Sequence, residues 1–110
     1  MRQGTTPTYT LTIRGYDLTD KTVYVTVSSR GKKLTKTNDA LSIAYSEGAS
    51  TISFQLSQED TLLLGLGQAE VQVRFIDSTG NAKATNIANL TVERILLPGV
   101  ITYDGGDDHA

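Results

Sequence analysis

Apolar and polar residues alternate with a period of two along most of this chain, and this feature most constrains its fold. Residues 22–28 read Thr-Val-Tyr-Val-Thr-Val-Ser, which places Val23, Val25 and Val27 on one face of a strand. Similar alternation occurs over residues 8–13, 33–37, 41–46, 52–56 and 71–75. Since each run has one apolar and one polar face, the sequence predicts antiparallel sheets that bury one side.

Turn-forming residues separate these runs. Residues 29–32 and 47–49 contain glycine beside charged or small residues, and residues 77–81 read Asp-Ser-Thr-Gly-Asn. Glycine, asparagine, aspartate and serine favour the backbone conformations that tight turns require. The close spacing of these turns predicts about seven short strands.

The alternation breaks at Ser57. Residues 57–60 read Ser-Gln-Glu-Asp, with an acid three residues after the serine, as in a capping box. We therefore expect one or two turns of helix that cross between two strands and end at Gly65. Alternation then resumes, and a last strand is predicted over residues 84–95, before residues 97–99 (Leu-Pro-Gly) stop it.

The chain has 110 residues, which is enough for one domain with a modest core. Its pattern predicts an all-β fold, a single immunoglobulin-like antiparallel β-sandwich of about seven strands with one short helical turn. A small barrel is the alternative. We expect the sandwich over residues 8–97, between an N-terminal arm (residues 1–7) and a C-terminal arm with an acidic tail (residues 98–110).

Composition argues against several classes of chemistry. The chain has no cysteine, so it forms no disulfide, thiolate nucleophile or cysteine-ligated metal site. Its one histidine, His109, lies in a polar tail, where no packed site would hold a catalytic triad. Asp104, Asp107 and Asp108 in the same tail lack the spacing of a calcium-binding loop. We therefore expect no enzyme activity, no metal and no other cofactor.

The charge balance bears on partners. Lys and Arg number 10 against 12 Asp and Glu, a net charge of -2, which does not favour capture of nucleic acid or of an anionic membrane. Arg30, Lys32, Lys33 and Lys36 form the basic cluster of the sequence, on a predicted hairpin. We interpret it as the guard of an edge strand, with contact to phosphate or to an acidic partner as the alternative.

Two further features have both a structural and a functional interpretation. Glu59 and Asp60 are adjacent acids, but neighbours in the first turn of a helix point in different directions. We therefore interpret them as complementing the helix dipole rather than as the catalytic pair of a glycosidase. Tyr24 is expected on the outer face of its strand, where it would stack on a sugar, anchor an interface or pack against its cross-strand neighbours.

Three stretches together carry a resemblance. They are residues 2–8 (Arg-Gln-Gly-Thr-Thr-Pro-Thr), residues 56–61 (Leu-Ser-Gln-Glu-Asp-Thr) and the order of Val-Gln-Val-Arg at 71–74, the turn at 77–81 and Thr-Val-Glu-Arg-Ile-Leu at 91–96. Over most of its length the chain resembles small proteins encoded among the virion structural genes of tailed phages and prophages of Gram-positive gut bacteria. It is similar, more loosely, to the immunoglobulin-like N-terminal domain of upper baseplate proteins.

The resemblance implies a function by assembly rather than by chemistry. It implies a non-enzymatic structural component of the virion, in the tail or baseplate, that is assembled in the bacterial cytoplasm. The expected partners are other virion proteins and copies of the chain itself. A head decoration protein on the capsid is one alternative, and a module that binds host glycans is another.

The two arms are the candidate protein interfaces. The first is extended and β-prone and can add to the sheet edge of a neighbour. The second is an apolar segment beyond the Pro-Gly stop that can dock on another subunit. The residues concerned are Thr5, Thr6, Pro7 and Thr8 in the first arm and Val100, Ile101 and Tyr103 in the second. The alternative is that both arms fold back on their own domain.

Overall fold

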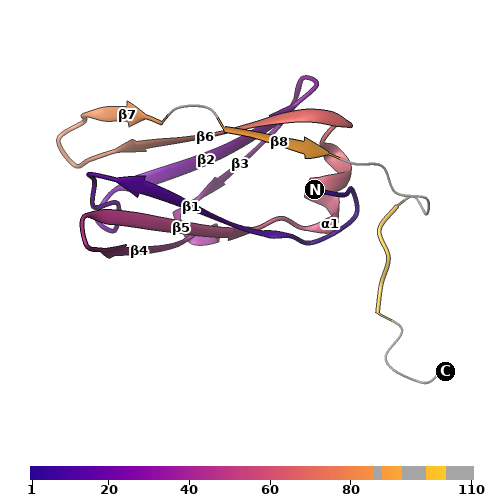
Figure 1. Ribbon diagram of the computed structural model, residues 1–110, viewed down its shortest axis with the longest axis horizontal. Helices are drawn as coiled ribbons and strands as arrows, with labels where there is room; N and C mark the ends of the chain where they lie inside the picture. The colour runs from indigo at the N-terminus through magenta and orange to yellow at the C-terminus, as the bar shows by residue number, and fades with distance from the viewer. Residues whose placement is uncertain (86–87, 93–98, 104–110) are drawn as a thin grey trace.

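The structure is a computed structural model that describes residues 1–85, 88–92 and 99–103. Two antiparallel sheets pack face to face as a sandwich, with one short helix at one end (Figure 1). The predicted all-β, immunoglobulin-like sandwich is therefore confirmed.

The first sheet contains three strands, in the order β1 (Thr8–Arg14), β5 (Ala49–Gln55) and β4 (Ser42–Ser46). The second sheet contains β3 (Lys32–Thr37), β2 (Thr22–Ser29) and β6 (Gly67–Ile76) in that order. Two short strands, β7 (Ala82–Ala84) and β8 (Ala88–Val92), both pair with the far side of β6. A 3-10 turn, η1 (Asn38–Ala40), and the helix α1 (Gln58–Leu63) complete the described elements.

The strand order shows which part of an immunoglobulin sandwich is present. β1, β5 and β4 take the places of strands B, E and D, and β3, β2, β6 and the β7–β8 pair take those of C′, C, F and G. Among the described residues, no strand takes the place of A, which would pair with β1. The short connection through η1 puts β3 and β4 at one side of the sandwich, so β1, β7 and β8 lie at the other (Figure 1).

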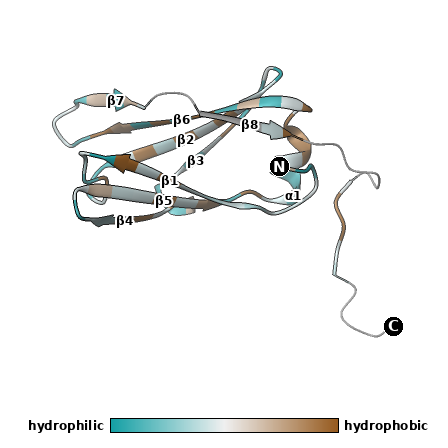
Figure 2. Ribbon diagram, in the orientation of Figure 1, coloured by the Kyte–Doolittle hydropathy of each residue, from teal (hydrophilic) through white to brown (hydrophobic). Residues whose placement is uncertain are grey.

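The core is made by the apolar faces that the alternation predicts. Val23, Val25 and Val27 of β2 are fully buried and form one cluster with Ile52 and Phe54 of β5. Each fully buried valine stabilises the fold by roughly 1.5 kcal/mol or more. Hydrophilic residues gather at the hairpin between β2 and β3 (Figure 2).

The single last strand predicted over residues 84–95 is wrong in its extent. β7 pairs Ala84 with Arg74, whereas β8 pairs Ala88 with Val71. The second pairing is one residue out of register with the first. The register of pairing with β6 therefore changes between the two short strands.

Thr85 accounts for this interruption. Its backbone N–H donates to the carbonyl oxygen of Val73 at 2.9 Å, and its hydroxyl accepts the N–H of Val73 at 3.1 Å. The amide of Gln72 in turn donates to the Thr85 carbonyl at 2.9 Å. A side-chain hydroxyl thus replaces a ladder hydrogen bond, which breaks the regular pairing. Residues 86–87 and 93–95 of the predicted strand lie outside the described residues.

The capping box predicted at Ser57 is confirmed. Its hydroxyl accepts the N–H of Asp60 at 3.0 Å, and the Asp60 carboxylate accepts the N–H of Ser57 at 2.9 Å. The helix ends at Leu63, earlier than predicted, and Gly65 does not have the positive φ of a helix C-cap. Gly65 serves close packing instead, because a Cβ there would lie 2.9 Å from the Cβ of Arg30.

Residues 1–7 lie against their own domain, as the fold-back alternative expects. The α-amino group of Met1 donates to the carbonyl oxygen of Thr91 in β8 at 2.7 Å, and the Met1 side chain packs on the core. The amide of Gln3 donates to the carbonyl oxygen of Leu64 at 3.1 Å. The N-terminal segment therefore contributes to the folded sandwich.

Candidate assembly interface

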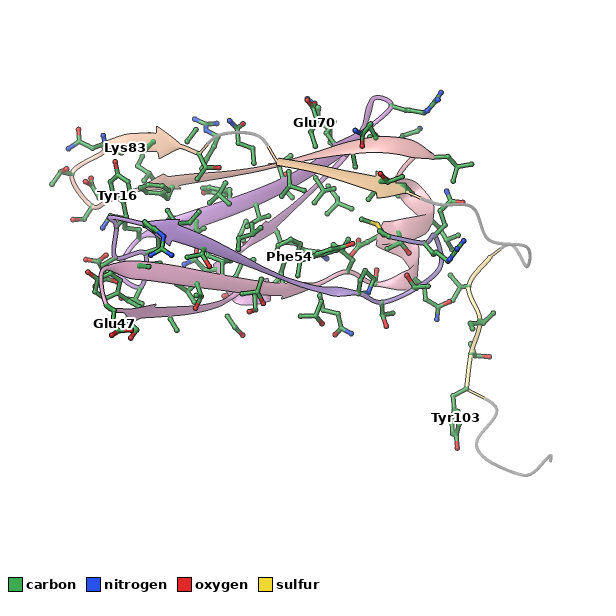
Figure 3. All side chains as sticks on the ribbon, in the orientation of Figure 1. Tyr16, Glu47, Phe54, Glu70, Lys83 and Tyr103 are labelled. Carbon is green, nitrogen blue, oxygen red and sulfur yellow. The ribbon has the colours of Figure 1, made fainter. Side chains whose placement is uncertain are left out.

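Residues 99–103, called here the C-terminal segment, carry the most exposed apolar side chains of the described chain. Val100, Ile101 and Tyr103 are 50, 56 and 87% exposed. The segment leaves the sandwich near α1, and Tyr103 projects away from the body of the protein (Figures 1 and 3). Uncovered apolar side chains gathered on one short segment are typical of a surface that binds another protein.

Gln58, in the first turn of α1, holds the C-terminal segment in place. Its amide nitrogen donates to the carbonyl oxygen of Ile101 at 2.8 Å, and its amide oxygen accepts the N–H of Ile101 at 2.7 Å. A strand residue in an antiparallel pair makes the same two hydrogen bonds to its partner. This role of Gln58 could not be predicted from the sequence, because no local pattern links two residues 43 positions apart.

Two leucines extend the apolar surface at the α1 end of the sandwich. Leu63 at the end of α1 is 47% exposed, and Leu66 just before β6 is 38% exposed. Neither belongs to the alternation that builds the core. The α1 end therefore presents apolar side chains from three parts of the chain.

The four N-terminal candidates are placed differently. The backbone carbonyls of three of them accept hydrogen bonds from their own domain. The Thr61 hydroxyl donates to Thr5, the Gln55 amide to Thr6 and the backbone N–H of Leu56 to Pro7. Thr8 begins β1 and pairs with Gln55. In the single chain this segment is bound to its own sandwich, so its role in an interface stays a prediction.

The acid pair and the basic hairpin have structural roles. The Nζ of Lys36 lies 2.7 Å from the Asp60 carboxylate, and the two side chains are 22 and 20% exposed. The Nε of Arg30 donates to the carbonyl oxygen of Leu66 at 2.7 Å. Glu59 is exposed beside Asp60. These contacts fix the β2–β3 hairpin to α1 and its following loop.

The electrostatics of Asp60 agree with this role. Burial acts to raise the pKa of its carboxyl group, but hydrogen bonds from Lys36 and Ser57 and the charge of Lys36 outweigh it. The pKa of Asp60 therefore lies below its ordinary value, and the carboxylate stays ionised near neutral pH. An acid held in this state is suited to an ion pair and a helix cap.

Two more carboxylates stabilise turns. The pKa of Asp17 is lowered chiefly by hydrogen bonds from Thr19, and that of Asp77 chiefly by a hydrogen bond from the Thr79 hydroxyl, helped by Asn81. Each acid accepts bonds from residues two to four positions ahead. Both are therefore local turn acceptors.

The outer face of the second sheet carries two shallow hollows. Tyr24 is 40% exposed on this face, opposite the buried valines, as predicted. With Arg74, Ile76 and Ala82 it lines a hollow of about 180 Å³. A second hollow of about 220 Å³ is lined by Thr26, Ser28, Lys33, Glu70 and Gln72. Both are smaller than the pockets that enclose most small ligands.

Other expectations concern metals and membranes. Within the described parts of the chain, no three acidic, histidine or cysteine side chains gather as metal ligands. In the same parts, no helix has the length and apolar character needed to cross a bilayer. Asp104, Asp107, Asp108 and His109 lie outside the described residues.

The sequence matches no protein-family model and no curated protein. Among the exposed surfaces of the described residues, the C-terminal segment and its anchor Gln58 are the most distinctive.

Proposed function

We propose that this protein is a non-enzymatic structural component of a tailed-phage virion, in the tail or baseplate, that acts by protein–protein assembly. The C-terminal segment carries the proposal, because Val100, Ile101 and Tyr103 are exposed on a stretch that Gln58 holds in position. A binding segment that is already ordered loses less conformational entropy when it docks. The virion assignment itself rests on the sequence resemblance described above.

Quantitative mass spectrometry of purified particles tests this proposal. The particles come from the phage or induced prophage whose genome encodes the chain. We expect the chain at a small fraction of the copy number of the major capsid protein. A ratio near one would support head decoration instead. Absence from intact particles, despite expression during infection, would overturn the structural role.

The contribution of the C-terminal segment can be tested in the same particles. Ile101→Asp puts a charge into the exposed apolar segment without touching the core, so we expect about tenfold fewer copies per particle, equivalent to about 1.4 kcal/mol. Thr102→Asp adds the same charge to the neighbouring residue, which is exposed but polar, and serves as the control. Equal incorporation of the two variants would argue against the segment as the assembly contact.

Host-glycan binding is the second candidate, and one observation favours it. Tyr24 and Arg74 border a hollow on an exposed sheet face, and an exposed ring beside a planar cation can stack on and hydrogen-bond a sugar. A glycan array followed by titration tests it. Binding that is lost in Tyr24→Ala but kept in Tyr45→Ala, an exposed tyrosine of the other sheet, would support this function.

A further inference from the structure

We propose that the open edge of β1 accepts the C-terminal segment of a second copy of this chain as an added strand. The inference deepens the proposed assembly role and rests on it for its biological setting. It names the contact by which copies would join, and it concerns the purified protein alone.

The hydrogen-bond pattern shows which groups of β1 face outward. The carbonyl oxygen of Pro7 accepts from Leu56, and the N–H of Gly15 donates to Gly48, so both point toward the neighbouring strand β5. The N–H and C=O of one strand residue share a side, and the side alternates along the strand. The backbone groups of the four even-numbered residues of β1 therefore point away from β5. These residues are Thr8, Thr10, Thr12 and Arg14.

This edge lacks the protection found on another edge of the sandwich. β3 ends the second sheet with Lys32, Lys33 and Lys36, the residue type that most often prevents a strand from pairing with another chain. On β1 three of the four outward positions are threonine. β1 has neither proline nor a bulge, and its seven residues pair with β5 without interruption. Its edge can therefore accept a further strand.

Burial shows that the sandwich is incomplete beside β1. Tyr9, Leu11 and Ile13 face the core but are only partly buried, whereas the core-facing valines of β2 are fully buried. In the opposite sheet, Lys83 pairs with Phe75 and so shares the inner face of the sheet, yet it is exposed. Both observations indicate that no strand of the described part of the chain covers this side between β1 and β7.

The N-terminal segment fills only one end of this opening. Met1 bonds to Thr91 of β8 and Gln3 to Leu64, both at the α1 end of the sandwich. Accordingly Val92 of β8 is buried, while all three residues of β7 at the other end are exposed. Among the residues that the structure describes, no strand pairs with the outer side of β1 from Thr8 to Arg14.

The C-terminal segment has the properties of the missing strand. Figure 1 shows it as an elongated stretch, and strand alternation would put Ile101 and Tyr103 on one face and Val100 on the other. Gln58 already bonds one side of Ile101 as a neighbouring strand would, which leaves the other side of the segment for a partner. Aspartate follows Tyr103 in the sequence, and Arg14 and Lys83 border the opening, so the charges are complementary.

The occupant must come from another copy. Gln58 fixes Ile101 at the α1 end, and only Thr102 and Tyr103 continue the apolar segment beyond it. Two residues span about 7 Å, which is too short to lay this segment along the roughly 23 Å of the same chain's β1. Donor and acceptor are different surfaces, so the contact is heterologous and builds a ring or a filament.

Sedimentation velocity of the purified full chain, at concentrations from micromolar to about millimolar, tests the inference. We expect association that is lost in Thr12→Pro, which removes an outward N–H from the acceptor edge, and in Ile101→Asp, which puts a charge on the donor. Thr102→Asp is the matched donor control. Tyr45→Pro is the acceptor control, since Tyr45 presents its N–H at the outer edge of β4. Both controls should still associate.

Mixing the two disabled variants gives the decisive result. Thr12→Pro keeps an intact donor and Ile101→Asp keeps an intact acceptor, so an equimolar mixture should form a dimer of one of each and nothing larger. No dimer in the mixture, loss of association in Tyr45→Pro alone, or an unmodified chain that stays monomeric throughout would overturn the inference. If circular dichroism shows that Thr12→Pro is unfolded, the comparison of Ile101→Asp with Thr102→Asp decides, because both residues lie outside the core.

The outcomes separate this inference from the proposed function. A chain that is present in particles but monomeric alone keeps the virion role and loses the strand-addition contact. A chain that associates as expected but is absent from particles keeps the contact and loses the virion role.

Discussion

Ser50 is expected to be the polar side chain whose loss most destabilises the sandwich. Its hydroxyl is fully buried, accepts the N–H of Leu18 at 2.9 Å and donates to the carbonyl oxygen of Tyr16 at 2.7 Å. These bonds tie the β1–β2 connection to β5. Ser50→Ala removes both and leaves two backbone groups without their partner.

The magnitude follows from the burial of the two orphaned groups. A buried, unsatisfied backbone group costs about 1–3 kcal/mol, and the N–H of Leu18 lies beside a side chain with no exposure. The Tyr16 carbonyl is only part-buried and adds about 1 kcal/mol. We therefore expect Ser50→Ala to lower the free energy of unfolding by about 2–4 kcal/mol. The melting temperature should fall by roughly 8–16 °C.

Urea denaturation followed by tyrosine fluorescence measures this change, since the chain has no tryptophan. Ser53→Ala is the matched control on the same strand, because the Ser53 hydroxyl bonds only to the exposed hydroxyl of Thr10. This substitution should lower the free energy of unfolding by less than about 0.5 kcal/mol. If the two variants lose the same stability, the hydrogen bonds of Ser50 do not support the fold as argued.

Substitutions at Asp60, Gly65 and Val25 test the packing and the electrostatics. Asp60→Ala should lower the free energy of unfolding by about 1 kcal/mol, because it removes the carboxylate that caps α1 and pairs with Lys36. The pKa of Asp60 is lower in the folded protein than its ordinary value of 3.8, so its charge stabilises the fold relative to Asp60→Asn at pH values above 3.8. This stability disappears as the pH falls through the folded pKa. Urea denaturation of both proteins at several pH values would show the loss. Gly65→Ala should lower the free energy of unfolding by about 1–2 kcal/mol, because the added Cβ would collide with the Arg30 side chain. The loss should be smaller in an Arg30→Gly background, which a double-mutant cycle measures. Val25→Ala should cost about 2 kcal/mol in thermal denaturation, because it leaves a cavity between the sheets.

Much of the fold could be predicted from local pattern. The valines of β2 and the turn at residues 77–81 are local signals, and the capping box at Ser57 needs only a serine and an acid three residues later. Each of these features is determined by residues close together in the sequence. The structure confirms all of them for that reason.

What could not be predicted depends on distant contacts. The interruption of the strand at Thr85 arises because the Thr85 hydroxyl accepts the N–H of Val73, a bond that strand alternation does not predict. Gly65 is a glycine because Arg30 packs against it, not because it ends the helix. The link between Gln58 and Ile101 joins a helix to a segment outside the sandwich. Such contacts appear only when the elements are assembled.

Hydrogen–deuterium exchange at β1 tests the central claim, that copies assemble through this edge, most directly. In the dilute chain, the outward amides of Thr10 and Thr12 should exchange fast, while those of Leu11 and Ile13 are protected by β5. In the assembled protein, at high concentration or in the particle, the amides of Thr10 and Thr12 should become as protected as their neighbours. Unchanged fast exchange at these two amides in the assembly would contradict the account.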